Sequence, residues 1–321
     1  DTAQPVTVTA VDVDLVELDE LVGVDASASS SDPFFDGVQA SHVLSVRDND
    51  VVVPRPDRVA EVFVSPQPFN QGSYVTSPGE YHTFRIPSLE VAPDGSLLAW
   101  AEGRRGTGHD PRRQGNAPID LVQSRSTDGG ATWAPLSVVD PGHQANGWLV
   151  DFADPTAVVD TTTDPDTLLL LYGQWPDQGP IHPVPGDDPD PAAVNQVLWI
   201  RSSTDSGYTW SDRTQIPKPF QPPHTPDGLY WRYVEPGPGN GIQLGWQDGA
   251  NAGLNGRLVV PVKRSGSSTP DGSASTLPFA LYSDDHGATW QIGNPAAGPA
   301  GNEDEVVELT SGEVLLDARQ N

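Results

Sequence analysis

The sequence predicts an all-β protein of the propeller type, in which several small sheets are arranged around an axis. Three copies of the turn Ser-x-Asp-x-Gly-x-Thr-Trp support this fold. Their aspartates, Asp128, Asp205 and Asp285, follow one another at intervals of 77 and 80 residues, and such long-period repetition is typical of propellers. The 321 residues include 33 prolines and 32 glycines, spread along the chain, which favours turns over helices.

The first 65 residues differ from the rest and predict an acidic N-terminal extension or linker. Between Val6 and Val24, valine or leucine alternates with aspartate or glutamate. This pattern indicates one or two strands with a solvated face, or an acidic linker. The serine-rich stretch from Ala26 to Pro33 is typical of a flexible connector.

From about residue 66 to residue 321, strand-like runs recur in a fixed order before each repeated turn. Each unit predicts a four-stranded blade: a pair of strands, a longer connection, a third strand, the turn and a last strand. The expected pairs are 84–89 with 97–102, 157–160 with 167–172, 242–244 with 257–262, and 305–309 with 313–318. The third strands are 121–125, 197–201 and 279–282. Three blades are therefore expected whole, and a fourth stops after two strands.

The repeated turn has a structural explanation. Its aspartate accepts hydrogen bonds from nearby backbone N–H groups, and its glycine adopts a conformation that other residues resist. Its tryptophan packs back against the strands. We therefore expect these turns to stabilise the blades and to take no part in chemistry.

Charge and composition exclude several classes of partner. The net charge of −27 argues against nucleic acid and anionic membranes as partners, and it suggests adaptation to high salt, where self-repulsion is screened. No run approaches the roughly 20 apolar residues of a membrane span. The absence of cysteine excludes disulfides and thiolate metal sites. We expect neither a cofactor nor a metal; the acidic run 186–190 could bind calcium, but a solvated loop is the favoured interpretation.

Four segments suggest chemistry. Arg85 lies in Phe-Arg-Ile-Pro at the start of an apolar strand, and a glycine-rich loop follows Glu102-Gly-Arg104. Asp154 lies in Phe-Ala-Asp-Pro at the entry of a strand, and the last hairpin, 302–319, is rich in charge. Alone, each segment has an ordinary explanation as an edge, a loop, a turn or a solvated face.

Together, these segments resemble those of bacterial exo-α-sialidases (neuraminidases), especially the secreted actinobacterial type, over residues 66–321. The resemblance rests on the Phe-Arg-Ile-Pro motif, on the three turns, which that family calls Asp boxes or BNR repeats, and on the order of the remaining motifs. Those motifs are 102–104, 152–155, 237–244, 256–262, 302–303 and 306–309. The resemblance implies a six-bladed β-propeller, of which about three and a half blades are present. It also implies release of terminal α-linked sialic acids with retention of configuration.

The resemblance also implies a role for individual residues. Two arginines of a triad that binds the substrate carboxylate are expected to be Arg85 and Arg319. Asp110 resembles the catalytic acid/base, with Asp120 as an alternative. Glu303 resembles the glutamate that activates a tyrosine nucleophile. The residues that resemble those holding the O4 region of the sugar are Arg104 and Asp154.

These residue types suit the chemistry. Converging guanidinium groups hold a carboxylate through bidentate, charge-assisted hydrogen bonds. A tyrosine nucleophile is a known exception among retaining glycosidases; its neutral phenol avoids repulsion by the substrate carboxylate but needs a base, expected to be Glu303. Asp110, kept protonated by burial once substrate binds, would donate a proton to the leaving oxygen and then activate water.

The family's third arginine and its tyrosine are expected beyond Asn321, because none of the seven tyrosines occupies the matching place. We therefore expect the 321-residue chain alone to be inactive. A trans-sialidase and a catalytically inactive, sialic-acid-binding or glycan-binding propeller stay open as alternatives. The expected partners are sialylated glycans, glycoproteins or glycolipids. The protein is expected to be a monomer, secreted or at the cell surface.

Overall fold

The computed structural model describes much of the chain in separate stretches. These are residues 20–27, 39–46, 60–64, 67–68, 80–105, 108, 110–111, 117–145, 148–176, 197–216, 230–267, 275–294, 296 and 301–320. The chain divides into two compact units, residues 1–59 and 60–321.

The first unit contains an antiparallel hairpin. Strand β1 (Glu20–Ser27) pairs with β2 (Gln39–Val46), so that Glu20 lies opposite Val46. The serine-rich connector predicted from Ala26 therefore begins later, because Ala26 and Ser27 belong to β1. The rest of that connector lies outside the described residues.

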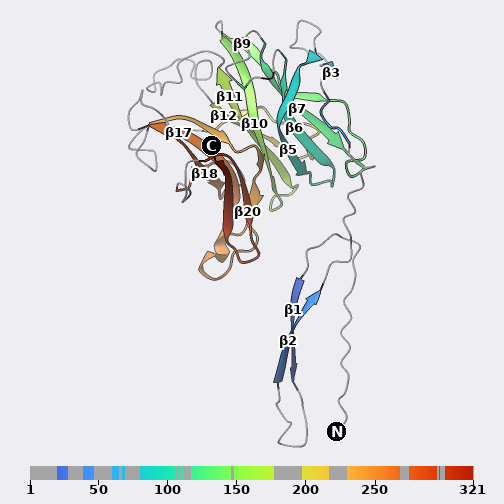
Figure 1. Cartoon of the computed structure of the whole chain (residues 1–321), viewed down its shortest axis with the longest axis vertical. Helices are drawn as coiled ribbons and strands as arrows, with labels where there is room; N and C mark the ends of the chain where they lie inside the picture. Colours follow the sequence, from blue (N-terminus) through green and yellow to red (C-terminus); the bar gives the residue numbers. More distant parts are fainter. Residues whose placement is uncertain are drawn as a thin grey trace, which may run out of the picture. The chain divides into compact units, whose positions relative to one another are not determined.

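The second unit contains sheets that follow one another along the chain (Figure 1). The first sheet has the order β5-β6-β7-β8, with every pair antiparallel. Its strands are β5 (Thr83–Val91), β6 (Leu97–Arg104), β7 (Ile119–Ser126) and β8 (Ser137–Asp140). A short pair, β3 (Gln67–Pro68) with β4 (Glu80–Tyr81), precedes it.

The second and third sheets repeat this order. In the second, β10-β11-β12-β13 are antiparallel neighbours, β9 pairs with β10, and β15 joins β10 in parallel. Its strands are β9 (His143–Ala145), β10 (Trp148–Asp160), β11 (Thr167–Pro176), β12 (Val197–Ser203), β13 (Thr214–Gln215) and β15 (Gly239–Asn240).

In the third sheet, β14-β17-β18-β19 are neighbours and β16 pairs with β17. Its strands are β14 (Tyr230–Pro236), β16 (Ile242–Gln243), β17 (Leu258–Ser267), β18 (Ser275–Ser283) and β19 (Gln291–Ile292). A final hairpin, β20 (Gly301–Glu308) with β21 (Val314–Gln320), packs against β17 and β18.

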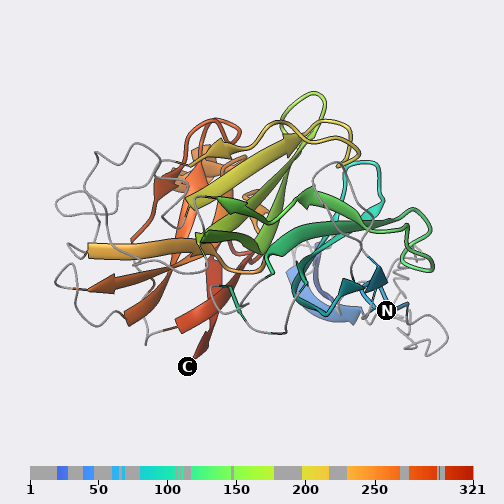
Figure 2. The same cartoon turned by 90° about the horizontal axis from the view of Figure 1, so that it is seen from above.

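The all-β prediction is confirmed within the described ranges, where the helical structure consists of a 3₁₀ segment, η2 (Gly249–Leu254). Three sheets and a following two-stranded hairpin agree with a propeller-type arrangement. In the third sheet the predicted strand at 242–244 is the short β16, and β14, which was not predicted, pairs with most of β17. Seen from above, the sheets lie in succession rather than stacked in two layers (Figure 2).

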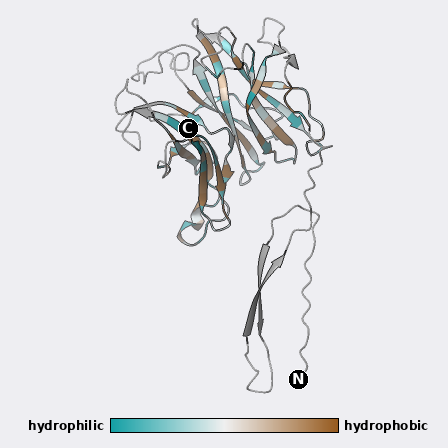
Figure 3. Ribbon diagram, in the orientation of Figure 1, coloured by the Kyte–Doolittle hydropathy of each residue, from teal (hydrophilic) through white to brown (hydrophobic). Residues whose placement is uncertain are grey.

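The core lies between neighbouring sheets. Because side chains alternate along a strand, Leu168 and Leu170 of β11 join a cluster with Trp100 of the first sheet. Leu169 and Leu171, which point to the opposite face of β11, join a second cluster that reaches the third sheet. Hydrophobic colour accordingly marks the strands of the second unit (Figure 3). The second sheet is thus held by apolar contacts on both faces.

Candidate active site

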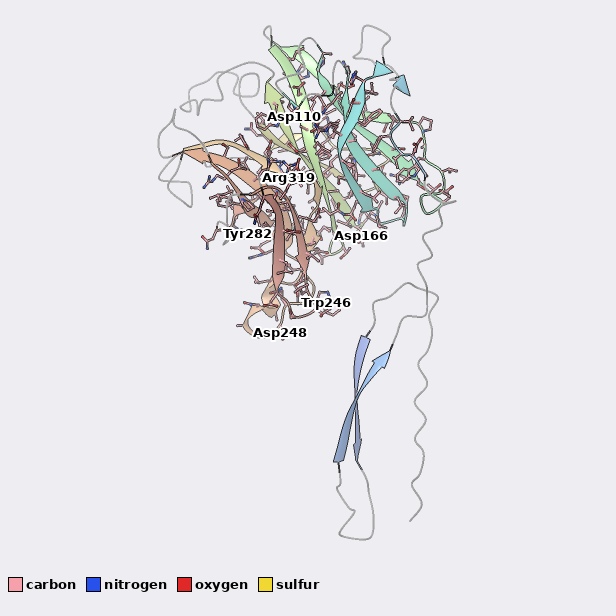
Figure 4. All side chains as sticks on the ribbon, viewed as in Figure 1. Asp110, Asp166, Trp246, Asp248, Tyr282 and Arg319 are labelled. Atoms are coloured by element: carbon pink, nitrogen blue, oxygen red, sulfur yellow. The ribbon has the colours of Figure 1, made fainter. Side chains whose placement is uncertain are left out.

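A cavity of about 620 Å³ is lined by charged residues that are far apart in the sequence. The residues come from all three sheets and from the last hairpin. They are Arg85, Ile86, Glu102, Arg104, Asp110, Pro111, Asp154, Trp175, Tyr233, Glu235, Lys263, Asn302, Glu303 and Arg319. Figure 4 shows Asp110 and Arg319 in the upper part of the second unit, away from Trp246 and Asp248 at the lower loop. The cavity contains all six residues that the sequence singles out.

Arg85 reaches the cavity from an irregular point of β5. The register of β5 with β6 shifts between Arg85 and Ser88, and Ile86 has a φ of 54°. A β-branched residue with positive φ is a rare backbone outlier. The bulge re-aims the side chain, and the Arg85 guanidinium, with a side chain 46% exposed, donates to Asp110 Oδ1 at 3.0 Å.

Arg104 is fully buried at the end of β6 and is held on several sides. It donates to Glu102 Oε2 at 2.9 and 2.5 Å, to the Gly108 carbonyl at 2.7 Å and to Asp110 Oδ1 at 3.3 Å. Burial, and then the nearby Asp154, raise the pKa of Glu102 to about 8, although Arg104 opposes this shift. Arg104 therefore orients two carboxyl groups at the edge of the cavity.

Asp154 lies within a strand, and the sequence-based prediction of a strand entry is wrong here. Strand β10 already begins at Trp148 and continues through Asp154. The pairing of β10 with β11 shifts between Ala153 and Thr156, and Asp154 has a φ of 55°. The proline after Asp154 is typical of a turn, but the strand accommodates it in a β-bulge. In this bulge Asp154 lines the cavity.

Lys263 and Glu235 were not found from the sequence. They are direct neighbours across the β14–β17 pair, and both are buried. Lys263 Nζ lies 3.2 Å from Glu235 Oε1 and 3.6 Å from Asp154 Oδ1. Burial opposes the charge of the ammonium group, but the carboxylates of Asp154 and Glu235 outweigh it and raise the Lys263 pKa. The sequence did contain a signal for this residue: Lys263 is one of only two lysines and follows directly on an apolar run.

Glu303 and Arg319 lie on the paired strands β20 and β21. Arg319 Nη1 is 2.8 Å from Glu303 Oε2, and the two side chains are 57% and 30% exposed. The neighbouring Asp304 is buried instead, and neither of its carboxyl oxygens has a hydrogen-bond partner among the residues that the structure describes. Burial raises the pKa of Asp304 to about 8, against the effect of Lys263 and with that of Glu305 and Asp154.

Asp120, the alternative acid/base, has a different environment. Its side chain is fully buried, and it accepts hydrogen bonds from Arg105, from the Tyr81 hydroxyl at 2.7 Å and from the Gly142 amide at 2.8 Å. These contacts tie β7 to β4 and to the segments that follow β6 and β8. The exposed Asp110, whose side chain is 62% exposed beside Arg85, is the carboxylate that lines the cavity.

Two aromatic residues of the cavity were also missed. Tyr233 packs against Trp175, with ring centroids 5.0 Å apart. The Tyr233 hydroxyl lies 3.4 Å from Thr276 Oγ1, and burial, followed by the charge of Glu235, raises its pKa. Tyr233 lies on β14, before the last hairpin, whereas the resemblance implies a tyrosine beyond that hairpin, so the motifs gave no signal for it.

Within the described part of the chain, no group of three His, Asp or Glu side chains is arranged to hold a metal ion. The acidic run 186–190 lies outside the described residues. No helix among the described residues is long and apolar enough to cross a membrane.

Comparison with known families identifies the fold. A family model described as BNR repeat-like domain matches residues 86–318. The chain belongs to the BNR repeat-like domain family. The match covers the three repeated turns, all of β20 and the first five residues of β21.

Curated relatives of the BNR-repeat chain are sialidases. The sialidase of Micromonospora viridifaciens is 37% identical over 242 residues, which are 75% of this chain and 33% of that protein. The sialidase of Paraclostridium sordellii is 27% identical over 241 residues, 74% of this chain and 52% of the relative. The chain thus spans between a third and about half of the length of these two relatives.

Solved structures agree on the fold. The structure described as a Hadza microbial sialidase superposes with a TM-score of 0.56 at 23% identity, covering 89% of this chain and 54% of the other. A Trypanosoma rangeli sialidase in complex with the inhibitor DANA gives a TM-score of 0.55 at 23% identity, covering 78% and 37%. These likenesses support a sialidase-type arrangement of the sheets.

Proposed function

We propose that the protein is an exo-α-sialidase, a glycoside hydrolase that releases terminal α-linked sialic acids from glycans, glycoproteins or glycolipids with retention of configuration. The observation that carries this proposal is the convergence of Arg85, Asp110, Glu303 and Arg319 on one cavity. These residues come from β5, from the loop after β6, from β20 and from β21. The sialidase relatives support the same activity.

Arg85 and Arg319 are the proposed ligands of the sugar's carboxylate. Their side chains are 46% and 57% exposed, and each pairs with one carboxylate, Asp110 or Glu303. A bound carboxylate could accept bidentate hydrogen bonds from such guanidinium groups. Because the whole chain carries a charge of −27, this local cationic pair has to attract the anionic sugar against the general field.

Asp110 and Glu303 are the proposed catalytic carboxyl groups. Asp110 would donate a proton to the leaving oxygen and then take one from water. Glu303 would take the proton of a tyrosine nucleophile, since a neutral phenol needs a base. Arg104 and Asp154, whose positions are coupled through Glu102, are proposed to hold the ring on the side of O4.

We further propose that the sheets of residues 66–321 are part of a six-bladed propeller of the sialidase type, and that residues 1–65 form a separate extension. Three successive sheets of the same strand order support this proposal. Because the proposed substrates are terminal sugars of glycoconjugates, we place the action of the enzyme outside the cell or at its surface, as a monomer.

The proposal is tested with the protein at the length its gene encodes. We expect release of sialic acid from 3′-sialyllactose, and we expect Arg85→Met to weaken the binding of free sialic acid about 10-fold to 100-fold, as loss of hydrogen bonds to a charged group does. Isothermal titration calorimetry measures the binding.

Arg257→Met is the matched control. Arg257 also pairs with an aspartate, with its Nε 2.7 Å from Asp284 Oδ1, but it does not line the cavity. Its affinity for sialic acid should equal that of the native protein. Binding without hydrolysis would contradict the proposed activity and favour the glycan-binding alternative.

A further inference from the structure

The wall of the cavity formed by β10, β14 and β17 contains one ammonium group and two carboxyl groups in close contact. Lys263 is only 3% exposed yet lines the cavity, and its ammonium lies 3.2 Å from Glu235 and 3.6 Å from Asp154. A buried ammonium is costly unless carboxylates surround it. Lys263 is therefore a charged residue at a buried position of the kind that apolar side chains usually occupy.

The arrangement of donors and acceptors points to the kind of group that fits here. An ammonium has three N–H donors and no acceptor, whereas Asp154 and Glu235 supply acceptors when ionised. A second anion would be repelled by these two carboxylates, and an apolar group would leave the polar atoms without water. A hydroxyl fits, since it accepts from the ammonium and donates to a carboxylate.

The distance agrees with this assignment. Lys263 Nζ and Asp154 Oδ1 are 3.6 Å apart. An oxygen at about 2.8 Å from each atom, an ordinary length for charge-assisted hydrogen bonds, completes a triangle with them. The anion-binding pair, Arg85 and Arg319, belongs to other strands, so a ligand with one carboxylate and several hydroxyls meets two chemically different walls.

We propose that Lys263 is a specificity-determining binding residue: together with Asp154 it recognises one hydroxyl group of the bound sugar. Glu235, directly across the strand pair, holds the ammonium in position. This inference rests on the proposed function and adds to it a residue that the motifs did not indicate. It means that sugars lacking this hydroxyl are rejected, because two buried charged groups then lose their partner.

The test measures the coupling between Lys263 and each hydroxyl. Free N-acetylneuraminic acid and its monodeoxy derivatives are titrated into the native protein and into a Lys263→Met/Glu235→Gln variant. Replacing Glu235 together with Lys263 avoids leaving the nearest carboxylate, Glu235, as an unpaired buried charge. In the native protein, one derivative should bind about 10-fold more weakly than the parent sugar, the loss expected for a charge-assisted hydrogen bond. In the variant that penalty should become clearly smaller, because Asp154 alone still binds the hydroxyl, while the other derivatives show unchanged ratios.

Arg257→Met, outside the cavity, is the control and should keep the native pattern. A second measurement is made on the native protein. With ¹⁵N-labelled lysine, the Lys263 ammonium signal is assigned as the one that is lost in the Lys263→Met/Glu235→Gln variant. The Lys263 signal should shift with the parent sugar and stay in place with the affected derivative.

Equal penalties in native and variant proteins, or an unmoved Lys263 signal while the sugar binds, would overturn the inference and leave the proposed function intact. Failure of the native protein to bind N-acetylneuraminic acid at all would reject the proposed function and the inference with it. The two failures thus differ in the native titration.

Discussion

At the scale of single residues, the cavity depends on backbone positions that are unfavourable on their own. Ile86 and Asp154 have φ values of 54° and 55°, and both lie where a strand pair changes register. Such conformations cost about 1–3 kcal/mol each and persist only where the surroundings impose them. Here each irregularity brings a charged side chain, Arg85 or Asp154, to the cavity. The strain is therefore linked to the proposed site rather than to the stability of the sheets.

Asp110 is the residue whose role is easiest to test. In the protein at the length its gene encodes, Asp110→Asn should lower kcat for 3′-sialyllactose by about 10²-fold to 10⁴-fold, the usual contribution of a general acid. A substrate with a good leaving group, such as a 4-methylumbelliferyl sialoside, should lose less in its first step. Binding of sialic acid should persist, because Arg85 loses a competing carboxylate. Steady-state kinetics with both substrates measure the effect.

Asp120→Asn is the counterpart of that variant. Asp120 binds Arg105, Tyr81 and Gly142 within the fold, so its replacement should lower the melting temperature and leave kcat of the folded protein near the native value. The opposite result, with Asp120→Asn inactive and Asp110→Asn active, would assign the acid/base role to Asp120.

At the scale of elements, the repeated turns join one sheet to the preceding one. In each turn the aspartate accepts from the threonine amide and hydroxyl four residues later, as Asp205 does at 2.8 and 2.5 Å. The second turn also reaches the first sheet: Gln123 and Arg125 donate to the carbonyls of Gly207 and Ser206. His286 of the third turn likewise contacts Asp160 of the second sheet at 2.8 Å. The second and third turns thus connect neighbouring sheets through hydrogen bonds.

The glycine of each turn allows this contact to be measured. Gly207 and Gly130 occupy equivalent places with φ of 80° and 87°, but a Cβ on Gly207 would lie 2.6 Å from the buried Leu98, whereas one on Gly130 would lie 3.4 Å from Leu97. Gly207→Ala should therefore destabilise the protein by about 1–3 kcal/mol more than Gly130→Ala, the range seen for overpacking. Urea unfolding followed by circular dichroism compares the two. Equal losses would show that the strained φ alone matters.

At the scale of the whole molecule, a chain of charge −27 buries carboxyl groups beside its cavity. Burial raises the pKa of Asp304 to about 8 from an ordinary value of 3.8, and Glu305 and Asp154 add to this against the effect of Lys263. The folded protein then binds a proton at Asp304 that the unfolded chain releases above about pH 4. Folding is therefore coupled to proton uptake between about pH 4 and 8.

Stability should fall as the pH rises through this window. For Asp304 the loss amounts to at most about 1.4 kcal/mol per pH unit, because one more proton is bound in the folded state. Asp304→Asn, which resembles the protonated acid, should flatten the dependence; Glu102, with its pKa also raised to about 8, should maintain part of it. Free energies of unfolding in urea at pH 5, 6, 7 and 8 measure the slopes. Identical slopes for native and variant proteins would rule out a protonated Asp304.

Much of the fold and part of the site could be predicted because their signals are local. Each repeated turn is recognised from a motif of eight consecutive residues, and alternating apolar runs predict most of the strands. Arg85, Asp110, Asp154, Glu303 and Arg319 were found through short motifs, and all of them line one cavity.

What the sequence determined, then, is the all-β class, the order of most strands within the sheets and the motif residues, since hydrogen bonding and side-chain alternation act between near neighbours. What only the tertiary structure decided is which buried charges share a space. Glu235, Lys263 and Asp154 are separated by up to 109 residues, 263 minus 154, and meet because β10, β14 and β17 come together. The structure also decided which of Asp110 and Asp120 lines the cavity, because the burial and the partners of a carboxylate depend on the fold rather than on its spacing in the sequence.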